Sequence, residues 1–335
     1  MNAQSKTKRN VVILFIILLI ISLLSYFIGD YFVSFALIPN QGGQDRQVQE
    51  DVNSDQHQLT SQQLELIHKN QKLSENQRDQ WLKDVHSKTE RVSIQSHDHL
   101  TLVGHTFKQE KQSHHWVILV HGYQSNEEDA LQLAPSFYEH GYNILTIDMR
   151  AHDESQGEYI GMGILDRYDL KSWTEFLVEQ DPDSQIVYHG TSMGGATVLM
   201  TSGLDLPTNV KAIISDCAYS DVWDIFASEL KQRFNLSTFP VLDLANAVAG
   251  MKAGYHFKDA SATQALSKNT LPILYIHSQK DDFVPIEMLS TVYKANKAAG
   301  KEKIIIQNAH HADSKHAEPQ RYYQSIFDFL SKHIK

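Results

Sequence analysis

The sequence predicts an α/β fold in which a mostly parallel sheet is covered by helices on both faces. Strand-like apolar runs alternate with helix-forming stretches from residue 116 to the C-terminus. One of these runs, Trp116 to Val120, is entirely apolar, which is typical of a central strand buried on both sides. Another, Ile186 to Tyr188, leads through a glycine-rich turn into a helix-forming run from Ala196 to Met200.

The N-terminus predicts a membrane anchor. Residues 1–10 carry Lys6, Lys8 and Arg9 without an acidic residue, and residues 11–29 form an apolar segment. Its uncharged run from Val11 to Ile28 would span about 27 Å as a helix, close to the thickness of the hydrocarbon core. The basic flank is expected to remain cytoplasmic as a tail, with the rest of the chain outside the membrane.

A cleaved signal peptide is the alternative to an anchor. The residues Ser34, Phe35 and Ala36 fit a small-x-small cleavage site. The apolar run is longer than that of a usual cleaved signal, and Phe and Leu crowd the candidate site. We therefore favour an uncleaved signal-anchor helix.

Residues 30–90 are expected to connect the anchor to a folded domain. The stretch from 41 to 58 is rich in Gln, Asn, Asp and Ser and predicts a solvated tether. The stretch from 61 to 85 contains better helix formers, with Ile67 and Trp81 among its possible packing residues. It predicts a helix that lies on the domain.

Residues 91–335 form the expected α/β domain. A hairpin over 92–94 and 100–103 opens it. The elements that follow the strand at Trp116 to Val120 are a helix over 127–140, a strand over 142–147, a helix over 165–179, strands over 210–215 and 272–277, a helix over 286–299, a strand over 303–306 and a helix over 319–334.

An insertion at about residues 220–262 interrupts this alternation. It predicts two helices, over 222–234 and 241–251, with apolar faces that include Trp223, Phe226, Phe234 and Phe239. We expect a small cap that gives a largely apolar pocket, the alternative being helices that only pack on the body.

The composition excludes several classes of function. The net charge of −10 leaves no surplus basic face, so nucleic acid is not an expected partner. The single cysteine, Cys217, excludes an internal disulfide and a cysteine-based zinc site. The 18 histidines are scattered without a metal-binding motif. No metal or organic cofactor is expected.

The glycine-rich turn after Tyr188 has the pattern G-x-S-x-G, formed by Gly190, Ser192 and Gly194. Between a strand and a helix this pattern is typical of a nucleophile elbow, which exposes the serine hydroxyl above the sheet. The helix that follows would direct its N-terminus at the serine and stabilise a developing oxyanion. A structural turn with no chemistry would have the same local pattern.

Polar residues follow the other predicted strands. Because the carboxyl ends of parallel strands meet at one edge of a sheet, these residues are expected to lie near Ser192. A nucleophilic serine needs a base, and the base needs an acid to orient it. The order Ser, Asp, His along the chain matches a known triad order. The residues concerned are His121, Asp148, Asp216, Asp281, Asp282, His310 and His311.

From about Arg91 onward, the chain resembles the serine hydrolases of the α/β-hydrolase superfamily. It is similar to bacterial N-terminally membrane-anchored members of the Bem46-like and serine-aminopeptidase-like branch. The resemblance rests on motifs that begin at His121, Asp148, Gly190, His277 and Ala309. The chain departs from the family pattern at Asp153, Ser278 and His310, where glycine is usual.

The resemblance implies Ser192 as the nucleophile and the backbone N–H groups of Tyr123 and Met193 as oxyanion donors. It implies Asp281 as the acid, with the neighbouring Asp282 facing away and Asp216 as a rival. It implies His311 as the base, with His316 as a further candidate and His310 at a position where it would crowd the base.

The expected function is hydrolysis of a carboxylic ester through an acyl-enzyme, outside the membrane and without a cofactor. A serine peptidase is the alternative, and Glu154, Asp216 and Asp221 are possible partners for a free N-terminus. A thioesterase and a catalytically silent surface binding module also remain open. Arg150 and His152 are expected to brace their loop, His121 to be structural and Cys217 to be a small buried residue.

Overall fold

The computed structural model describes residues 3–41 and 58–334. An eight-stranded sheet forms its centre, in the order β1-β2-β4-β3-β5-β6-β7-β8. Strands β1 and β2 pair antiparallel with each other, β2 pairs antiparallel with β4, and the other pairs are parallel. The strands are β1 (Thr89–Gln95), β2 (Thr101–Phe107), β3 (His115–Val120), β4 (Asn143–Ile147), β5 (Gln185–Thr191), β6 (Val210–Asp216), β7 (Ile273–Ser278) and β8 (Lys301–Ile306). The predicted fold class is confirmed.

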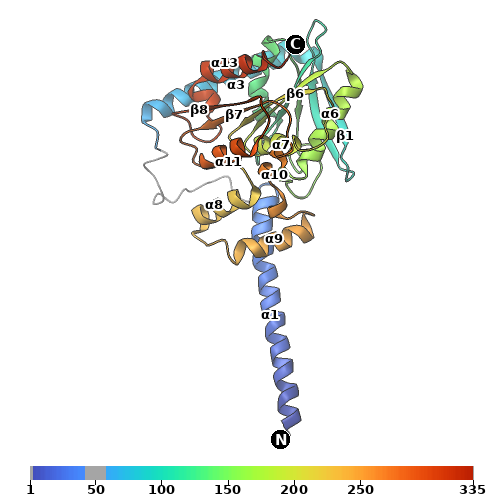
Figure 1. Ribbon diagram of the computed structural model, residues 1–335, viewed down its shortest axis with the longest axis vertical. Coiled ribbons are helices and arrows are strands. Elements are labelled where there is room, and N and C mark those ends of the chain that lie inside the picture. The colour runs from blue at the N-terminus through green and yellow to red at the C-terminus, as the bar shows by residue number, and fades with distance from the viewer. Residues whose placement is uncertain (1–2, 42–57, 335) are drawn as a thin grey trace.

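Helices cover both faces of this sheet, as Figure 1 shows. Those packed on one face are α3 (Ser61–Val85), α5 (Ala134–Glu139) and α13 (Pro319–Leu330). Those on the other face are α6 (Asp166–Gln180), α7 (Met193–Thr201), α10 (Ala262–Leu266) and α11 (Glu287–Ala295). Short elements complete the body: η1 (His86–Lys88), α4 (Glu127–Ala130), η2 (Leu131–Leu133), η3 (Phe257–Asp259) and α12 (Ser314–Ala317).

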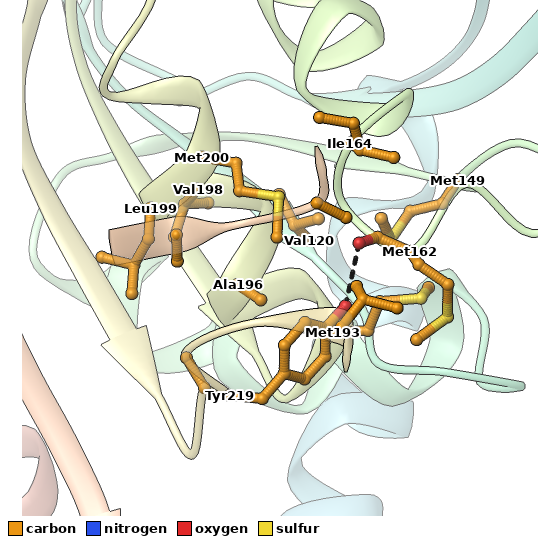
Figure 2. Close-up of a cluster of buried hydrophobic side chains, with 14 of the residues drawn as sticks. Val120, Met149, Met162, Ile164, Met193, Ala196, Val198, Leu199, Met200 and Tyr219 are labelled. Carbon is orange, nitrogen blue, oxygen red and sulfur yellow. Dashed lines mark hydrogen bonds between the residues drawn. The ribbon is translucent and has the colours of Figure 1, made fainter. Parts of the chain in front are cut away.

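The strands supply alternate side chains to two cores. In β3, Ile118 and Val120 join the core under α6 and α7, whereas Val117 and Leu119 join the core under α5 and α13. Figure 2 shows part of the first core, where side chains of α7 such as Met193 pack against Met149 and Met162. The Tyr219 hydroxyl donates a hydrogen bond of 3.0 Å to the Met162 carbonyl within this apolar cluster.

Three predicted helices differ from those observed, and one of them is the helix expected over 319–334, which ends at Leu330. The helix expected over 127–140 is divided into α4, η2 and α5, with Pro135 in the first turn of α5. A proline inside a continuous helix would remove one backbone hydrogen bond and clash with the preceding turn, so a new helix begins there. The helix expected over 286–299 ends at Ala295, because the Asn296 side chain accepts the Ala298 N–H and turns the chain.

The N-terminal helix α1 (Ala3–Leu37) is longer than the predicted anchor over 11–29. It begins within the predicted basic tail, and residues 30–37 continue the helix instead of starting a tether. Val33 and Leu37 are fully buried against the domain, whereas the apolar side chains from Val11 to Ile28 are exposed. The tether predicted over 41–58 lies almost entirely outside the described residues. The segment Lys8–Leu37 is long and apolar enough to cross a membrane.

The helix predicted over 61–85 is confirmed as α3, which buries Ile67, Trp81 and Val85. Thr60 caps its N-terminus by a reciprocal pair of hydrogen bonds with Gln63.

The predicted insertion contains α8 (Val222–Phe234) and α9 (Val241–Lys252). Both helices lie between the sheet domain and the projecting part of α1 (Figure 1). They form the expected cap, and α9 packs along α1.

Candidate active site

Ser192 stands in a strained turn between β5 and α7. Its backbone has φ 58° and ψ −117°, a conformation that an L-residue rarely adopts. A Cβ at Gly190 would lie 2.1 Å from the Gly194 carbonyl oxygen, and one at Gly194 would lie 2.2 Å from the Val120 carbonyl oxygen. Both glycines are therefore required where α7 approaches β3 and β5.

The Ser192 hydroxyl lies in hydrogen-bond contact with His311, which follows β8. The distance from Ser192 Oγ to His311 Nε2 is 2.7 Å. On the other side of the ring, His311 Nδ1 lies 2.8 Å and 3.0 Å from the two carboxylate oxygens of Asp281. A carboxylate can only accept, so Nδ1 carries the proton and Nε2 of the neutral ring accepts from Ser192.

Asp281 follows β7 and is held by its own loop. Its Oδ1 accepts the backbone N–H groups of Phe283 at 2.9 Å and Val284 at 2.7 Å. Burial alone would raise the pKa of this carboxyl, but the neighbouring His311 and the hydrogen bonds outweigh it and lower the pKa. Asp281 is therefore ionised beside His311.

The pKa of His311 is shifted in the opposite direction from that of Asp281. Burial favours the neutral ring, yet the attraction and hydrogen bond of Asp281, assisted by Asp282 and Asp216, raise the pKa of His311 above its usual 6.5. The protonated form of the ring is thus stabilised by the three neighbouring carboxylates.

The backbone N–H groups of Met193 and Tyr123 are the candidates for an oxyanion site. Met193 is the first residue of α7, where a helix leaves its N–H groups unpaired. Tyr123 follows β3 and Gly122, and a Cβ on Gly122 would lie 3.4 Å from the Ser192 Cβ. Within residues 3–41 and 58–334, neither the Tyr123 nor the Met193 N–H is hydrogen bonded to another residue. Both can receive an acceptor from outside the chain.

The other candidate acids and bases are not part of the hydrogen-bonded series of Ser192, His311 and Asp281 side chains. Asp216 is fully buried and accepts the Tyr322 hydroxyl at 2.9 Å. Asp282 accepts the backbone N–H of His311 at 3.2 Å and so holds the backbone of that residue. His316 is buried, its pKa lowered to about 3 by burial and by Lys315, and its backbone carbonyl accepts from Asn70. His310 is half-buried next to His311.

The loop after β4 is braced by residues that the sequence predicted as structural. The Arg150 guanidinium forms hydrogen bonds to both Asp169 and Asp98. His152 Nε2 accepts the Gln124 N–H at 3.2 Å. His121 Nε2 accepts the Met149 N–H at 2.9 Å, and burial together with His152 lowers its pKa to about 3. These contacts hold the backbone around Tyr123.

A cavity of about 490 Å³ opens over Ser192 and His311. This volume lies within the range of sites for small organic molecules. Its walls come from α1, the loop after β3 and the cap. They are lined by Phe32, Phe35, Ala36, Tyr123, Gln124, Ser125, Asp129, Met162, Ser192, Tyr219, Ile225, Phe226, Glu229, Leu230, Arg233, Phe234, Val241, Leu242, Ala245, Phe257, Phe283 and His311.

The contribution of α1 to this cavity was not predicted from the sequence. Phe32, Phe35 and Ala36 lie in the segment that was assigned to a tether and a possible cleavage site. The only signal in the sequence is that the helix-forming residues continue past Ile28 with aromatic and small side chains.

The acidic residues proposed for binding a free N-terminus do not line the cavity. Glu154 forms an ion pair with Arg91, Asp216 is bonded to Tyr322, and Asp221 accepts from Thr263. The acidic side chains in the lining are Asp129 and Glu229, and Glu229 forms a salt bridge of 2.7 Å with Arg233.

Two groups of side chains in the described ranges have potential metal ligands within 4.8 Å of one another, Cys217 with Asp281 and His311, and His97 with Asp98 and Asp169. In the first group, Asp281 and His311 are bonded to each other. In the second, both carboxylates bind the Arg150 guanidinium.

Comparisons with known proteins agree with this architecture. A family model described as the alpha/beta hydrolase fold matches residues 115–254, which include Ser192 and end before Asp281 and His311. The YqkD protein of Bacillus subtilis, described as uncharacterized, is 27% identical over 215 residues, covering 64% of this chain and 70% of its own length.

Solved structures are similar in fold. The esterase Pf2001 of Pyrococcus furiosus superimposes with a TM-score of 0.63 at 21% identity, over 76% of this chain and 94% of its own. The acylaminoacyl peptidase of Pyrococcus horikoshii gives a TM-score of 0.55 at 20% identity, over 73% of this chain and 41% of its own. At these identities the similarity concerns the fold.

Proposed function

We propose that this chain, a member of the α/β-hydrolase superfamily, is a serine hydrolase that cleaves carboxylic esters outside the cytoplasmic membrane. The continuous series of hydrogen bonds from Ser192 through His311 to Asp281 carries this assignment. The esterase among the structures of similar fold supports the choice of an ester.

In the proposed mechanism, Ser192 Oγ attacks the carbonyl carbon while His311 Nε2 takes its proton. Asp281 orients the ring and stabilises its protonated form. The oxyanion is held by the N–H groups of Tyr123 and Met193. His311 then returns the proton to the leaving alcohol, and water releases the acyl group by the same steps in reverse.

The position of α1 supports an anchor that is retained. Cleavage after Ala36 would cut a helix whose end is packed in the domain: the Ala36 carbonyl accepts the Tyr123 hydroxyl, and the Leu37 carbonyl accepts the Ile160 N–H, both at 2.8 Å. Lys8 and Arg9 flank the apolar segment on its N-terminal side, which favours a cytoplasmic N-terminus.

A fluorophosphonate probe that does not cross membranes tests the nucleophile and the orientation together. Intact cells that produce the full chain should be labelled, and cells that produce Ser192→Ala should not. Ser267→Ala, an exposed serine on the body, is the matched control and should be labelled like the unchanged chain. Absence of serine-dependent labelling even in lysed cells would favour a silent binding module.

Comparison of p-nitrophenyl butyrate with alanine p-nitroanilide separates an esterase from an aminopeptidase. Turnover of the ester at a kcat/KM at least about tenfold higher is expected, because the cavity walls are largely apolar. A preference for the anilide would favour a peptidase, for which Asp129 and Glu229 are the acidic residues available in the cavity.

A further inference from the structure

One wall of the cavity is the end of α1. Phe32 and Phe35 of α1 pack against Phe234 of the cap with ring centroids 5.2 Å and 5.4 Å apart. All three side chains line the cavity above Ser192. The cavity is therefore completed by the helix that also projects from the domain.

This end of α1 is fixed against the cap. A Cβ at Gly29 would lie 2.6 Å from the Leu244 carbonyl oxygen and 2.7 Å from a Val248 methyl group, so the two helices are in backbone contact. An ion pair between Asp30 of α1 and Lys252 of α9 also joins the two helices. The anchor and the cap are consequently one structural unit.

The height of the cavity above a bilayer follows from the geometry of α1. The exposed apolar run ends at Ile28, where the hydrocarbon core would end. At 1.5 Å per residue, Phe32 lies about 6 Å and Phe35 about 10 Å beyond that point. The polar headgroup layer is about 5–8 Å thick on each side of the core. The wall formed by α1 begins at headgroup level.

The cap presents apolar side chains on the same side of the domain. Phe239, in the loop between α8 and α9, is 75% exposed, and Met251 near the end of α9 is 67% exposed. Both helices lie on the side from which α1 projects (Figure 1). Tyr31, which is 57% exposed, lies at the position where aromatic residues gather at membrane interfaces.

We infer that the ester is part of a membrane lipid, and that its acyl chain enters from the outer leaflet into the cavity that α1 and the cap wall together, where it reaches Ser192. This inference rests on the proposed function. Ser192 Oγ forms a bond to the acyl carbon, the ester C–O bond breaks, and the alcohol part leaves with the proton from His311. Water then adds to the acyl carbon and a free fatty acid is released. Along this route the chain passes from lipid to aromatic walls without entering water.

The full chain reconstituted in phosphatidylcholine vesicles tests this route. Three lipid substrates are offered in the membrane: phosphatidylcholine itself, lysophosphatidylcholine and 1-oleoylglycerol. Release of fatty acid is measured beside hydrolysis of p-nitrophenyl butyrate in the surrounding water. The unchanged chain should cleave the soluble ester and at least one of the lipids.

The double variant Phe239→Ser, Met251→Ser changes the exposed face of the cap without altering the cavity lining. It should lower fatty acid release by about tenfold and leave butyrate hydrolysis unchanged, because only the contact with lipid is lost. The matched control is Leu66→Ser, Leu73→Ser on α3, where two exposed apolar residues lie far from α1 (Figure 1). It should change neither rate.

Each other outcome is decisive. Cleavage of butyrate without cleavage of any of the three lipids would overturn the inference and leave the proposed function standing. So would an unchanged rate on lipid in the cap variant, or an equal loss on both kinds of substrate. Failure to cleave the soluble ester as well as the lipids would overturn the proposed function, and the inference with it.

Discussion

Phe35 of the N-terminal helix and Phe234 of the cap meet edge to face, with ring centroids 5.4 Å apart and planes inclined at 74°. The two residues are separated by 199 positions in the chain, and both line the cavity that contains Ser192. The site thus depends on contacts within the sheet domain, which hold the proposed triad, and on contacts between α1 and the cap, which shape the cavity.

The identity of the acid is tested by two aspartate variants. Asp281→Asn should lower kcat by about 10⁴-fold, because His311 loses the partner that fixes its protonated nitrogen. Asp216→Asn should lower kcat by less than about tenfold, since an amide oxygen can still accept the Tyr322 hydroxyl. Kinetics with p-nitrophenyl butyrate measure both, and a larger loss in the Asp216 variant would reverse the assignment.

The pH dependence of kcat/KM reports the state of His311. The ring acts as a base only when neutral, so activity should be lost as the pH falls through its pKa, which is raised above 6.5. In Asp281→Asn, burial remains while the main attraction is removed, so the acidic limb should shift to lower pH.

Asp282→Asn is expected to change the pH dependence less than Asp281→Asn does. The amide oxygen can still accept the His311 N–H, and Asp281 is retained, so kcat should stay within about tenfold of the unchanged chain. The acidic limb should nevertheless move slightly to lower pH, because Asp282 also raises the pKa of His311. If the acidic limb of kcat/KM stays at the same pH in both Asp281→Asn and Asp282→Asn, a group other than His311 controls the pH dependence.

Asp148, which follows β4, should make stability depend on pH. It is 2% exposed and accepts the Glu127 N–H at 3.1 Å; burial, together with Glu127, raises its pKa to about 7. The folded state therefore binds a proton more tightly than the unfolded state, and this contribution to stability is lost as pH rises from about 4 through 7.

Asp148→Asn removes that titration while keeping an acceptor for the Glu127 N–H. The variant should melt a few degrees above the unchanged chain at pH 8 and close to it at pH 4.5. Thermal melting at the two pH values measures this. A difference in Tm that is the same at both values would contradict the raised pKa.

The contact between α1 and α9 is tested at Gly29. Gly29→Ala places a methyl group 2.6 Å from the Leu244 carbonyl oxygen and should force the helices apart, at a cost of about 1–3 kcal/mol. Ser22→Ala, at an exposed position two turns earlier in α1, is the control and should have little effect. Melting in detergent micelles and hydrolysis of a long-chain p-nitrophenyl ester report stability and cavity shape. Equal behaviour of the two variants would show that close packing at Gly29 is unimportant.

Much of the sheet domain could be predicted from the sequence because its signals are local. The run Trp116 to Val120 has no polar interruption, and Gly190 and Gly194 are dictated by close backbone contacts in one turn. The meeting of Ser192, Asp281 and His311 follows from the parallel topology, which brings the ends of β5, β7 and β8 to one edge. Their proposed roles await the experiments above.

The docking of α1 could not be predicted in the same way. Its residues are apolar on every side, so periodicity does not distinguish a face directed to lipid from one directed to protein. The role of Gly29 becomes visible only when α9 lies against it. Likewise, the helical pattern over 127–140 is continuous except for Pro135, and this single residue marks the break before α5.

The buried end of α1 is also synthesised long before the part of the cap that it contacts. Asp30 leaves the ribosome 222 residues before Lys252, its partner in the ion pair. The part of the cavity wall that α1 supplies is therefore synthesised well before the cap helices that pack against it. A domain that lacked α1 would have this flank of the cavity open, because Phe32, Phe35 and Ala36 would be missing from its wall.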